Sequence, residues 1–131
     1  MQVKVMSTTV DYSIVNAADT SQTLTVFTTT PNIYIMDFFA RVKTAFSGVT
    51  RPKVSLGVAG HTQFYVPTQN IGTVGDLLTG ACRDTANICT KIRSFQKTPA
   101  NVPILATFSS TSGNLSSLSA GVIEFVCVYV E

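Results

Sequence analysis

Few side chains in this chain could carry out catalysis, and none of them forms a recognisable catalytic motif. His61 is the only histidine. A jelly-roll metalloenzyme holds its metal with a cluster of histidine and carboxylate ligands, and one histidine cannot supply such a cluster. A Ser-His-Asp triad could be assembled from His61 with Asp76 or Asp84, but the Gly-x-Ser-x-Gly elbow is absent. We therefore predict that the protein is not an enzyme and uses no metal and no cofactor.

The acidic residues and glycines do not suggest a ligand site either. The seven acids are dispersed and none has calcium-loop spacing, and the glycines lack the Lys-Ser or Lys-Thr ending of a phosphate loop. A glycosidase pair stays open, because its two carboxylates meet only in the folded chain. Glu124 stands out because it interrupts an apolar segment, and we expect it to pair with Arg41 or Lys43.

The composition suggests a surface that is largely covered. Charged residues make up 12% of the chain and hydrophobic residues 45%, whereas a typical soluble domain is about 25% charged. The net charge of +2 is too small to predict nucleic-acid binding. Neither a membrane-spanning run nor the apolar region of a signal peptide is present. We expect a soluble product of the cytoplasm, without membrane or nucleic-acid partners, much of whose surface is buried between subunits.

The three cysteines are Cys82, Cys89 and Cys127. An odd number in a cytoplasmic product argues against a disulfide framework. A Cys82–Cys89 bridge remains an alternative, but we expect all three to act as small buried hydrophobic residues.

The dominant structural signal is β-strand, because Thr, Val, Ile, Phe and Tyr recur between closely spaced turn residues. The length fits one domain, residues 1–131. The pattern predicts an all-β, antiparallel, jelly-roll-like β-sandwich with at most one short helix. The expected strands are Val3–Met6, Val10–Val15, Thr23–Thr28, Asn32–Phe46, Lys53–Val58, Gln63–Val66, Lys91–Phe95, Ile104–Phe108 and Gly121–Val130.

Two connecting segments have their own signals. The Thr73-x-x-Asp76 spacing is typical of a helix start and predicts a short helix over Thr73–Leu78. The polar stretch 109–121 contains Leu115 and Leu118, which we expect to pin it to the core as an ordered loop.

Two long strands are apolar on both faces, which is unusual for a sheet with one side in water. In residues 32–46 the even-numbered side chains, Tyr34 to Val42, form a predicted core face. The chain's own loops could cover the other faces, but we favour a second subunit. The predicted interface residues are Ile33, Ile35, Phe39, Val122, Glu124, Val126, Val128 and Val130.

Five short segments have a familiar order and spacing: Thr29–Ile35, Ala106–Phe108, Gly113–Leu115, Ser119–Gly121 and Val126–Glu131. Together they resemble the small virion proteins of tailed bacteriophages. The resemblance implies a jelly-roll-like sandwich, usually a homotrimer, on a capsid surface or in a tail or fibre. We accordingly expect a bacteriophage virion structural protein, most simply a capsid decoration protein. Its partners would be copies of itself and other virion proteins such as the major capsid protein, with residues 1–10 as a candidate N-terminal arm.

A receptor- or glycan-binding module of a tail fibre is the alternative function. Sugar sites combine exposed aromatic rings with polar groups. The stretch Gln63–Asn70 offers Phe64, Tyr65, Gln69 and Asn70 as candidate ligand contacts. The basic residues Lys91, Arg93 and Lys97 could add a cationic patch, although a solvated surface is the simpler interpretation.

Overall fold

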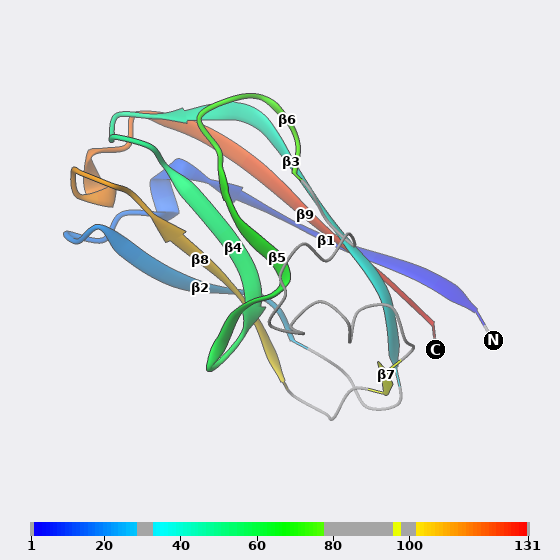
Figure 1. The fold of residues 1–131 in the computed structure, drawn as a ribbon. Helices are drawn as coiled ribbons and strands as arrows, with labels where there is room; N and C mark the ends of the chain where they lie inside the picture. Colours follow the sequence, from blue (N-terminus) through cyan, green and yellow to red (C-terminus); the bar gives the residue numbers. More distant parts are fainter. Residues whose placement is uncertain (1, 29–32, 78–95, 98–101, 131) are drawn as a thin grey trace.

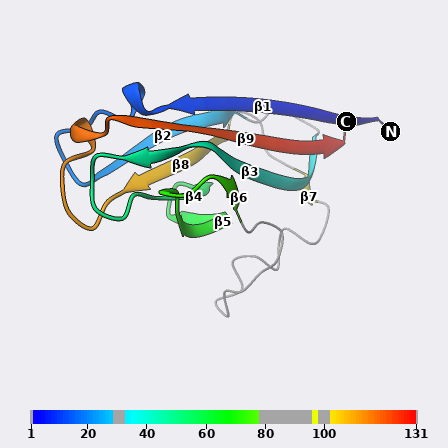
Figure 2. The ribbon, with the colours of Figure 1, turned by 90° about the horizontal axis from the view of Figure 1, so that it is seen from above.

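A computed structural model describes residues 2–28, 33–77, 96–97 and 102–130. It contains two antiparallel sheets packed face to face (Figures 1 and 2). The first sheet has the order β1-β9-β3-β6, with β7 also pairing with β3, and the second has the order β2-β8-β4-β5. The strands are β1 (Val3–Asp11), β2 (Ser21–Thr28), β3 (Tyr34–Ser47), β4 (Lys53–Val58), β5 (His61–Asn70), β6 (Gly75–Asp76), β7 (Gln96–Lys97), β8 (Pro103–Ser109) and β9 (Ala120–Val130).

The connectivity is that of a jelly roll. Apart from the β4–β5 hairpin, the chain crosses between the sheets at each step from β1 to β6 and again from β8 to β9. The first and last strands are neighbours, with Val3 opposite Val130 and Asp11 opposite Val122. With the two-residue β7 set aside, the remaining eight strands follow the double Greek key of the jelly roll. The predicted fold class is therefore confirmed.

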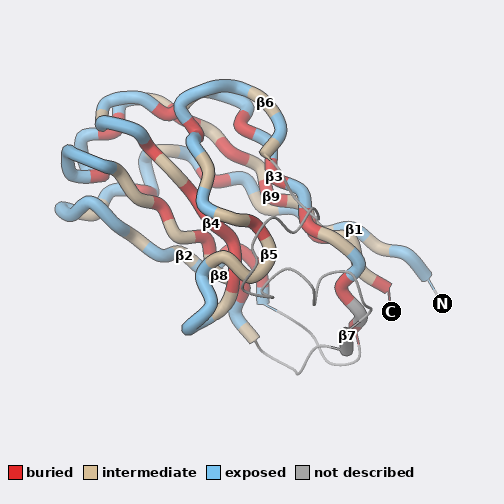
Figure 3. Tube along the Cα trace, viewed as in Figure 1, coloured by how far each residue is buried: buried red, intermediate tan, exposed pale blue. Residues whose placement is uncertain are grey.

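The core lies between the sheets, because alternate side chains of each strand face inwards. Ile123, Phe125 and Cys127 of β9 are fully buried. From the second sheet, Ile104, Ala106 and Phe108 of β8 are buried as well. Tilted pairs of aromatic rings join the two layers: the ring centroids of Phe38 in β3 and Tyr65 in β5 are 4.2 Å apart, and those of Phe46 and Phe108 are 5.9 Å apart. Buried and exposed residues alternate along the strands in Figure 3.

The polar stretch before β9 is an ordered loop, as expected. It contains a 3-10 helix, Leu115–Ser117, and both Leu115 and Leu118 are buried. The Leu115 N–H donates to the Asp19 carbonyl and the Ser119 N–H donates to the Ser47 carbonyl, each at about the ideal distance. The two buried leucines and these backbone hydrogen bonds together hold the loop against the sandwich.

A β-bulge at Met36 changes which residues of β3 face the core. Ile35 lies opposite Tyr129, and Asp37 lies opposite Val128, so Met36 is an extra residue on β3. Beyond the bulge the alternation is reversed. Ile35 consequently joins the core at 6% exposure, whereas Met36, predicted to face the core, is 37% exposed. The assumption of strict alternation along β3 was therefore wrong at Ile35 and Met36.

Two other expectations about local structure need correction. The predicted helix at Thr73 is wrong over the described residues, because Gly75 and Asp76 form the short strand β6 opposite Val42 and Arg41. Val3–Met6 and Val10–Asp11 belong to one strand, β1, which is followed by a 3-10 helix at Tyr12–Ile14. Residues 3–10 of the segment considered as an arm thus pair with β9 of its own chain. The strand predicted at Lys91–Phe95 lies outside the described residues.

Gly121 is a specific test of the core packing. It has a φ of +144°, and a Cβ atom at this position would overlap the ring of Phe46. We expect Gly121→Ala to lower the free energy of unfolding by about 3 kcal/mol, from overpacking together with the positive φ. Chemical denaturation followed by far-UV circular dichroism measures the loss.

Gly60→Ala is the matched control. Gly60 also has a positive φ, +80°, but nothing lies within 4 Å of its Cβ position. Only the backbone cost of about 1 kcal/mol should appear. Equal losses for the two variants would contradict the claim that close packing on Phe46 sets the requirement for glycine at position 121.

Candidate interaction surface

The outer faces of the two sheets differ in chemistry. The outer face of β2 and β8 is mostly hydroxyl-bearing, with Thr23 opposite Thr107 and Ser21 opposite Ser109. The hydroxyls of Thr23 and Thr107 lie 3.3 Å apart and share a hydrogen bond. This is the usual pattern of an antiparallel sheet with one side in water.

The outer face of β1-β9-β3 carries hydrophobic side chains instead. Two cross-strand rows define it: Val5, Val128 and Asp37 in one, and Ser7, Val126 and Phe39 in the next. The exposed fractions are high, 62% for Val5 and 48% for Phe39. We call this surface the apolar face; it consists of Val3, Val5, Met36, Phe39, Val126 and Val128.

The predicted interface residues divide into two groups. Phe39 is exposed, and the four β9 residues Val122, Glu124, Val126 and Val128 are partly exposed on the outer face. The chain itself buries Ile33, Ile35 and Val130, at 1%, 6% and 4% exposure, so these three present no side chain to a partner. The Met36 bulge explains Ile35, because it reverses the faces of β3.

The prediction missed Val3 and Val5, which are 60% and 62% exposed and continue the apolar face onto β1. The sequence carries a signal for this, because Val3 and Val5 share one face of the expected strand Val3–Met6. It was not used, because this strand was also a candidate arm, residues 1–10, and no face was assigned to its side chains.

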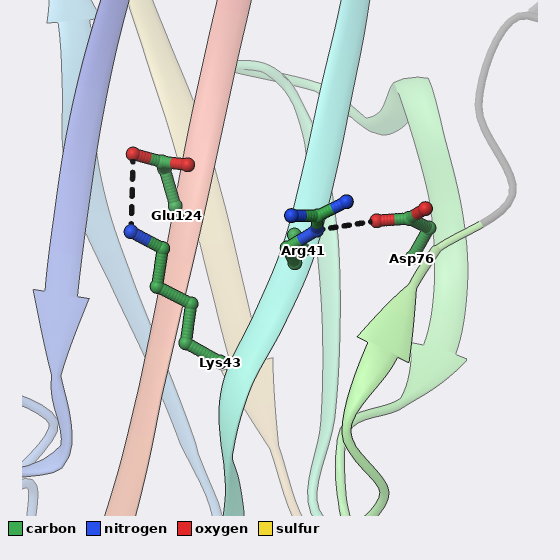
Figure 4. Close-up of polar contacts among 4 residues, drawn as sticks. All are labelled: Arg41, Lys43, Asp76 and Glu124. Carbon is green, nitrogen blue, oxygen red and sulfur yellow. Dashed lines mark hydrogen bonds and ion pairs between the residues drawn. The ribbon is translucent and has the colours of Figure 1, made fainter.

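Two ion pairs border the apolar face (Figure 4). Lys43 Nζ lies 3.4 Å from Glu124 Oε2, which confirms that Glu124 pairs with a base of β3. Arg41 Nε donates to Asp76 Oδ1 at 2.8 Å, linking β3 to β6. The Arg41 guanidinium holds the pKa of Asp76 below its ordinary value of 3.8, first by the hydrogen bond and then by its charge. Exposed pairs of this kind fix geometry more than they add stability.

A hollow of about 310 Å³ lies where the apolar face meets the ion pairs. Phe39, Val126 and Leu77 supply its apolar lining, and Arg41, Asp76 and Glu124 supply its polar lining. An apolar surface with a charged border resembles the core and rim of a protein–protein interface.

The candidate glycan-contacting residues do not converge on one spot. All four lie along β5, where Asn70 is opposite Lys53 at one end and Phe64 lies in the bulged stretch between Val66, opposite Leu56, and His61, opposite Val58. Tyr65 packs on Phe38 of the core, and burial raises its pKa to about 12. The Gln69 amide donates to the Pro67 carbonyl, and Asn70 Oδ1 accepts from the Gly72 N–H. Tyr65, Gln69 and Asn70 therefore already have local structural roles.

The remaining candidate groups add no chemistry within the part of the chain that is described. Cys127 is a free, buried thiol, as expected, and burial raises its pKa to about 12, with a smaller contribution from Asp37. Cys82, Cys89, Lys91 and Arg93 lie outside the described residues. The described residues contain no cluster of three or more histidine, cysteine or acidic side chains that could hold a metal. They also contain no helix long and apolar enough to cross a membrane.

Comparison with known proteins supports the fold. No protein-family model and no curated protein sequence matches the chain. Among solved structures, a chain of the cyanophage Pam1 capsid asymmetric unit is similar, with a TM-score of 0.63 and 13% identity. The match covers 97% of this chain and 83% of that chain. At this identity the likeness establishes a shared jelly-roll architecture.

The pKa of Asp76 tests the ion pair at the border of the hollow. Because folding lowers the pKa of Asp76, its ionised carboxylate stabilises the folded protein at pH values above 3.8. This contribution is lost as the pH falls through the pKa of the folded state. We expect Arg41→Met to return the pKa of Asp76 towards 3.8. Carboxyl chemical shifts followed by NMR titration measure the change.

Asp11 provides an internal control in the same titration. The pKa of Asp11 is also lowered, but by hydrogen bonds from the backbone and side chain of Ser13. Arg41→Met should leave it unchanged. If the pKa of Asp76 does not move in this variant, the Arg41–Asp76 contact does not persist in solution.

Proposed function

We propose that this protein is a bacteriophage virion structural protein, a capsid decoration protein that forms a homotrimer and packs on the particle without enzymatic activity. The observation that carries the proposal is an apolar outer face on one sheet of a jelly roll. The outer face of β2 and β8 in the other sheet is rich in hydroxyl groups and already suits water. The similarity to a phage capsid component supports the choice of a virion as the setting.

The free energy of burial favours a protein partner on the apolar face. Val3, Val5 and Phe39 each leave about half or more of their surface exposed. Covering the remainder would contribute about 1 kcal/mol per side chain. A symmetric assembly repeats the gain in every copy, which offsets the cost of association. The bordering ion pairs carry two positive and two negative groups, so the surface is not repelled by its own copy.

Self-association can be tested at Phe39. It lies opposite Val126, and both side chains line the hollow. Phe39→Asp would bury an unpaired carboxylate in the proposed contact. Multi-angle light scattering should find the wild-type protein as a trimer and the variant as a monomer. A loss of 2 kcal/mol at such a position weakens association by about 30-fold.

Thr25→Asp is the matched control, because Thr25 is exposed on the outer face of the other sheet. It should remain trimeric. A wild-type chain that is monomeric at micromolar concentration would exclude the trimer, and dissociation by both variants would show that added charge alone is responsible.

The virion setting has a separate test. Particles purified from the phage that encodes the chain should contain it, as measured by quantitative mass spectrometry. A decoration protein should be present at a copy number comparable to that of the shell protein, whereas a tail-fibre module should be present in a few copies only. Absence from the purified particles would refute the proposal.

A further inference from the structure

A ring of three identical chains needs two different contact surfaces on each chain. In a two-fold dimer one patch meets the same patch of the partner, whereas a closed ring brings one patch of each copy against another patch of the next. If the trimer of the proposed function forms, the apolar face with its hollow is one of the two surfaces. The other must lie elsewhere on the chain.

The exposed hydrophobic side chains narrow the choice of the second surface. Six large ones are exposed among the described residues. Four of them belong to the apolar face: Val3, Val5, Met36 and Phe39. Val74 lines a neighbouring hollow that shares Arg41 and Asp76 with the first, so it lies on the same side of the molecule. Ile14, at 50% exposure, is the one that remains.

Ile14 ends a well-anchored 3-10 turn that follows β1. The Asp11 carboxylate caps the turn by accepting a hydrogen bond from the Ser13 N–H at 2.9 Å. The Gln22 side-chain amide donates to the Ile14 carbonyl at 3.1 Å, and the next residue, Val15, is fully buried. Because this backbone is already fixed, Ile14 would lose little conformational freedom on binding a partner.

The hollow has the size and chemistry to receive such a side chain. Phe39, Val126 and Leu77 form its apolar lining, and the ring of Phe39 is 48% exposed. Its volume of about 310 Å³ is roughly ten times the share of one water molecule in the liquid. One branched aliphatic side chain can therefore enter it. A single anchor that fills a pocket is a common way for a protein interface to concentrate its binding energy.

The turn and the hollow lie too far apart to meet within one chain. Asp11, the last residue of β1, lies opposite Val122 of β9, and Ile14 follows it in the direction away from Val126. Val126 is about 13 Å along β9 from Val122, at the usual rise of a strand. Figure 1 shows the turn, in blue, at the end of the sandwich opposite the two termini. A contact between Ile14 and the hollow must therefore join two copies.

We propose that Ile14 of each copy inserts into the hollow of the next copy, so that three such contacts close a ring. The contact rests on the trimer of the proposed function and specifies how its copies meet. Each copy gives one isoleucine and receives one, which is the head-to-tail arrangement of a closed ring. Because the anchor is uncharged, the ion pairs at the border of the hollow, Arg41–Asp76 and Lys43–Glu124, keep their partners.

Cysteine crosslinking tests the contact and the ring together. Ile14→Cys and Val126→Cys place thiols on the two sides of the proposed contact, and a disulfide forms only where the two Cα atoms come within about 7 Å. Under mild oxidation, a chain with both substitutions should form covalent trimers on non-reducing gels. Chains with either substitution alone should not crosslink, and the wild-type chain controls for the native cysteines.

Thr25→Cys replaces Ile14→Cys in the matched control, because Thr25 is exposed on the outer face of the other sheet. Together with Val126→Cys it should give about tenfold less covalent trimer. Equal yields from the two double variants would overturn the Ile14 contact. Crosslinking of the Ile14→Cys, Val126→Cys chain that stops at dimers would overturn it as well, because a two-fold pairing does not close a ring of three.

Shortening the anchor gives a second measurement that needs no cysteine. Ile14→Ala should raise the concentration at which the trimer dissociates by about tenfold, as expected for the loss of one interface anchor. Its far-UV circular dichroism spectrum should not change, because the Ile14 side chain is half exposed in the folded chain. Sedimentation velocity over a concentration series measures the dissociation. An unchanged dissociation would count against the contact.

These measurements separate the Ile14 contact from the trimer itself. A wild-type chain that is monomeric in light scattering would refute both. A trimer that Phe39→Asp disrupts, but that neither crosslinks through Ile14→Cys nor weakens with Ile14→Ala, would refute only the Ile14 contact.

Discussion

Burial of alternate side chains between two sheets is the constraint on which the rest of this structure depends. Phe125 of one layer and Phe108 of the other are each at most 1% exposed, and aromatic contacts such as Phe46 with Phe108 join the layers. Because a strand turns successive residues to opposite faces, fixing one set in the core also fixes which set lies outside. The outer surface of this protein is therefore a direct consequence of its core.

That consequence differs for the two sheets. On β8 the residues that alternate with the core are partly polar, and Thr107 shares a hydrogen bond with Thr23. On β9 they are valines, apart from Glu124, which pairs with Lys43. Exposing a valine-rich sheet surface to water is unfavourable in free energy. The asymmetry between the two layers therefore gives the molecule one side that is suited to contact with protein. The ion pairs set the border of that side.

The jelly roll also determines which edges remain open. In this topology β1 and β2 lie at the same side of the sandwich, and the Thr8 hydroxyl of β1 bonds to the bulged Val26 of β2. The edge of β2 is thereby occupied, while that of β1 stays regular.

The sequence by itself determined the fold class, most strand positions and the outward set of β9, because these depend on local alternation and turn residues. β4 at Lys53–Val58 and the loop pinned by Leu115 were predictable in this way. Only the tertiary structure decided the bulge at Met36, which moved Ile35 from the predicted interface into the core. The tertiary structure also decided that a segment with a helix-start signal forms the strand β6. Asp76 of this strand accepts a hydrogen bond from Arg41, which is 35 residues away in the chain. Bulges and long-range partners depend on how neighbouring strands align, and that information is not contained in any single stretch of the chain.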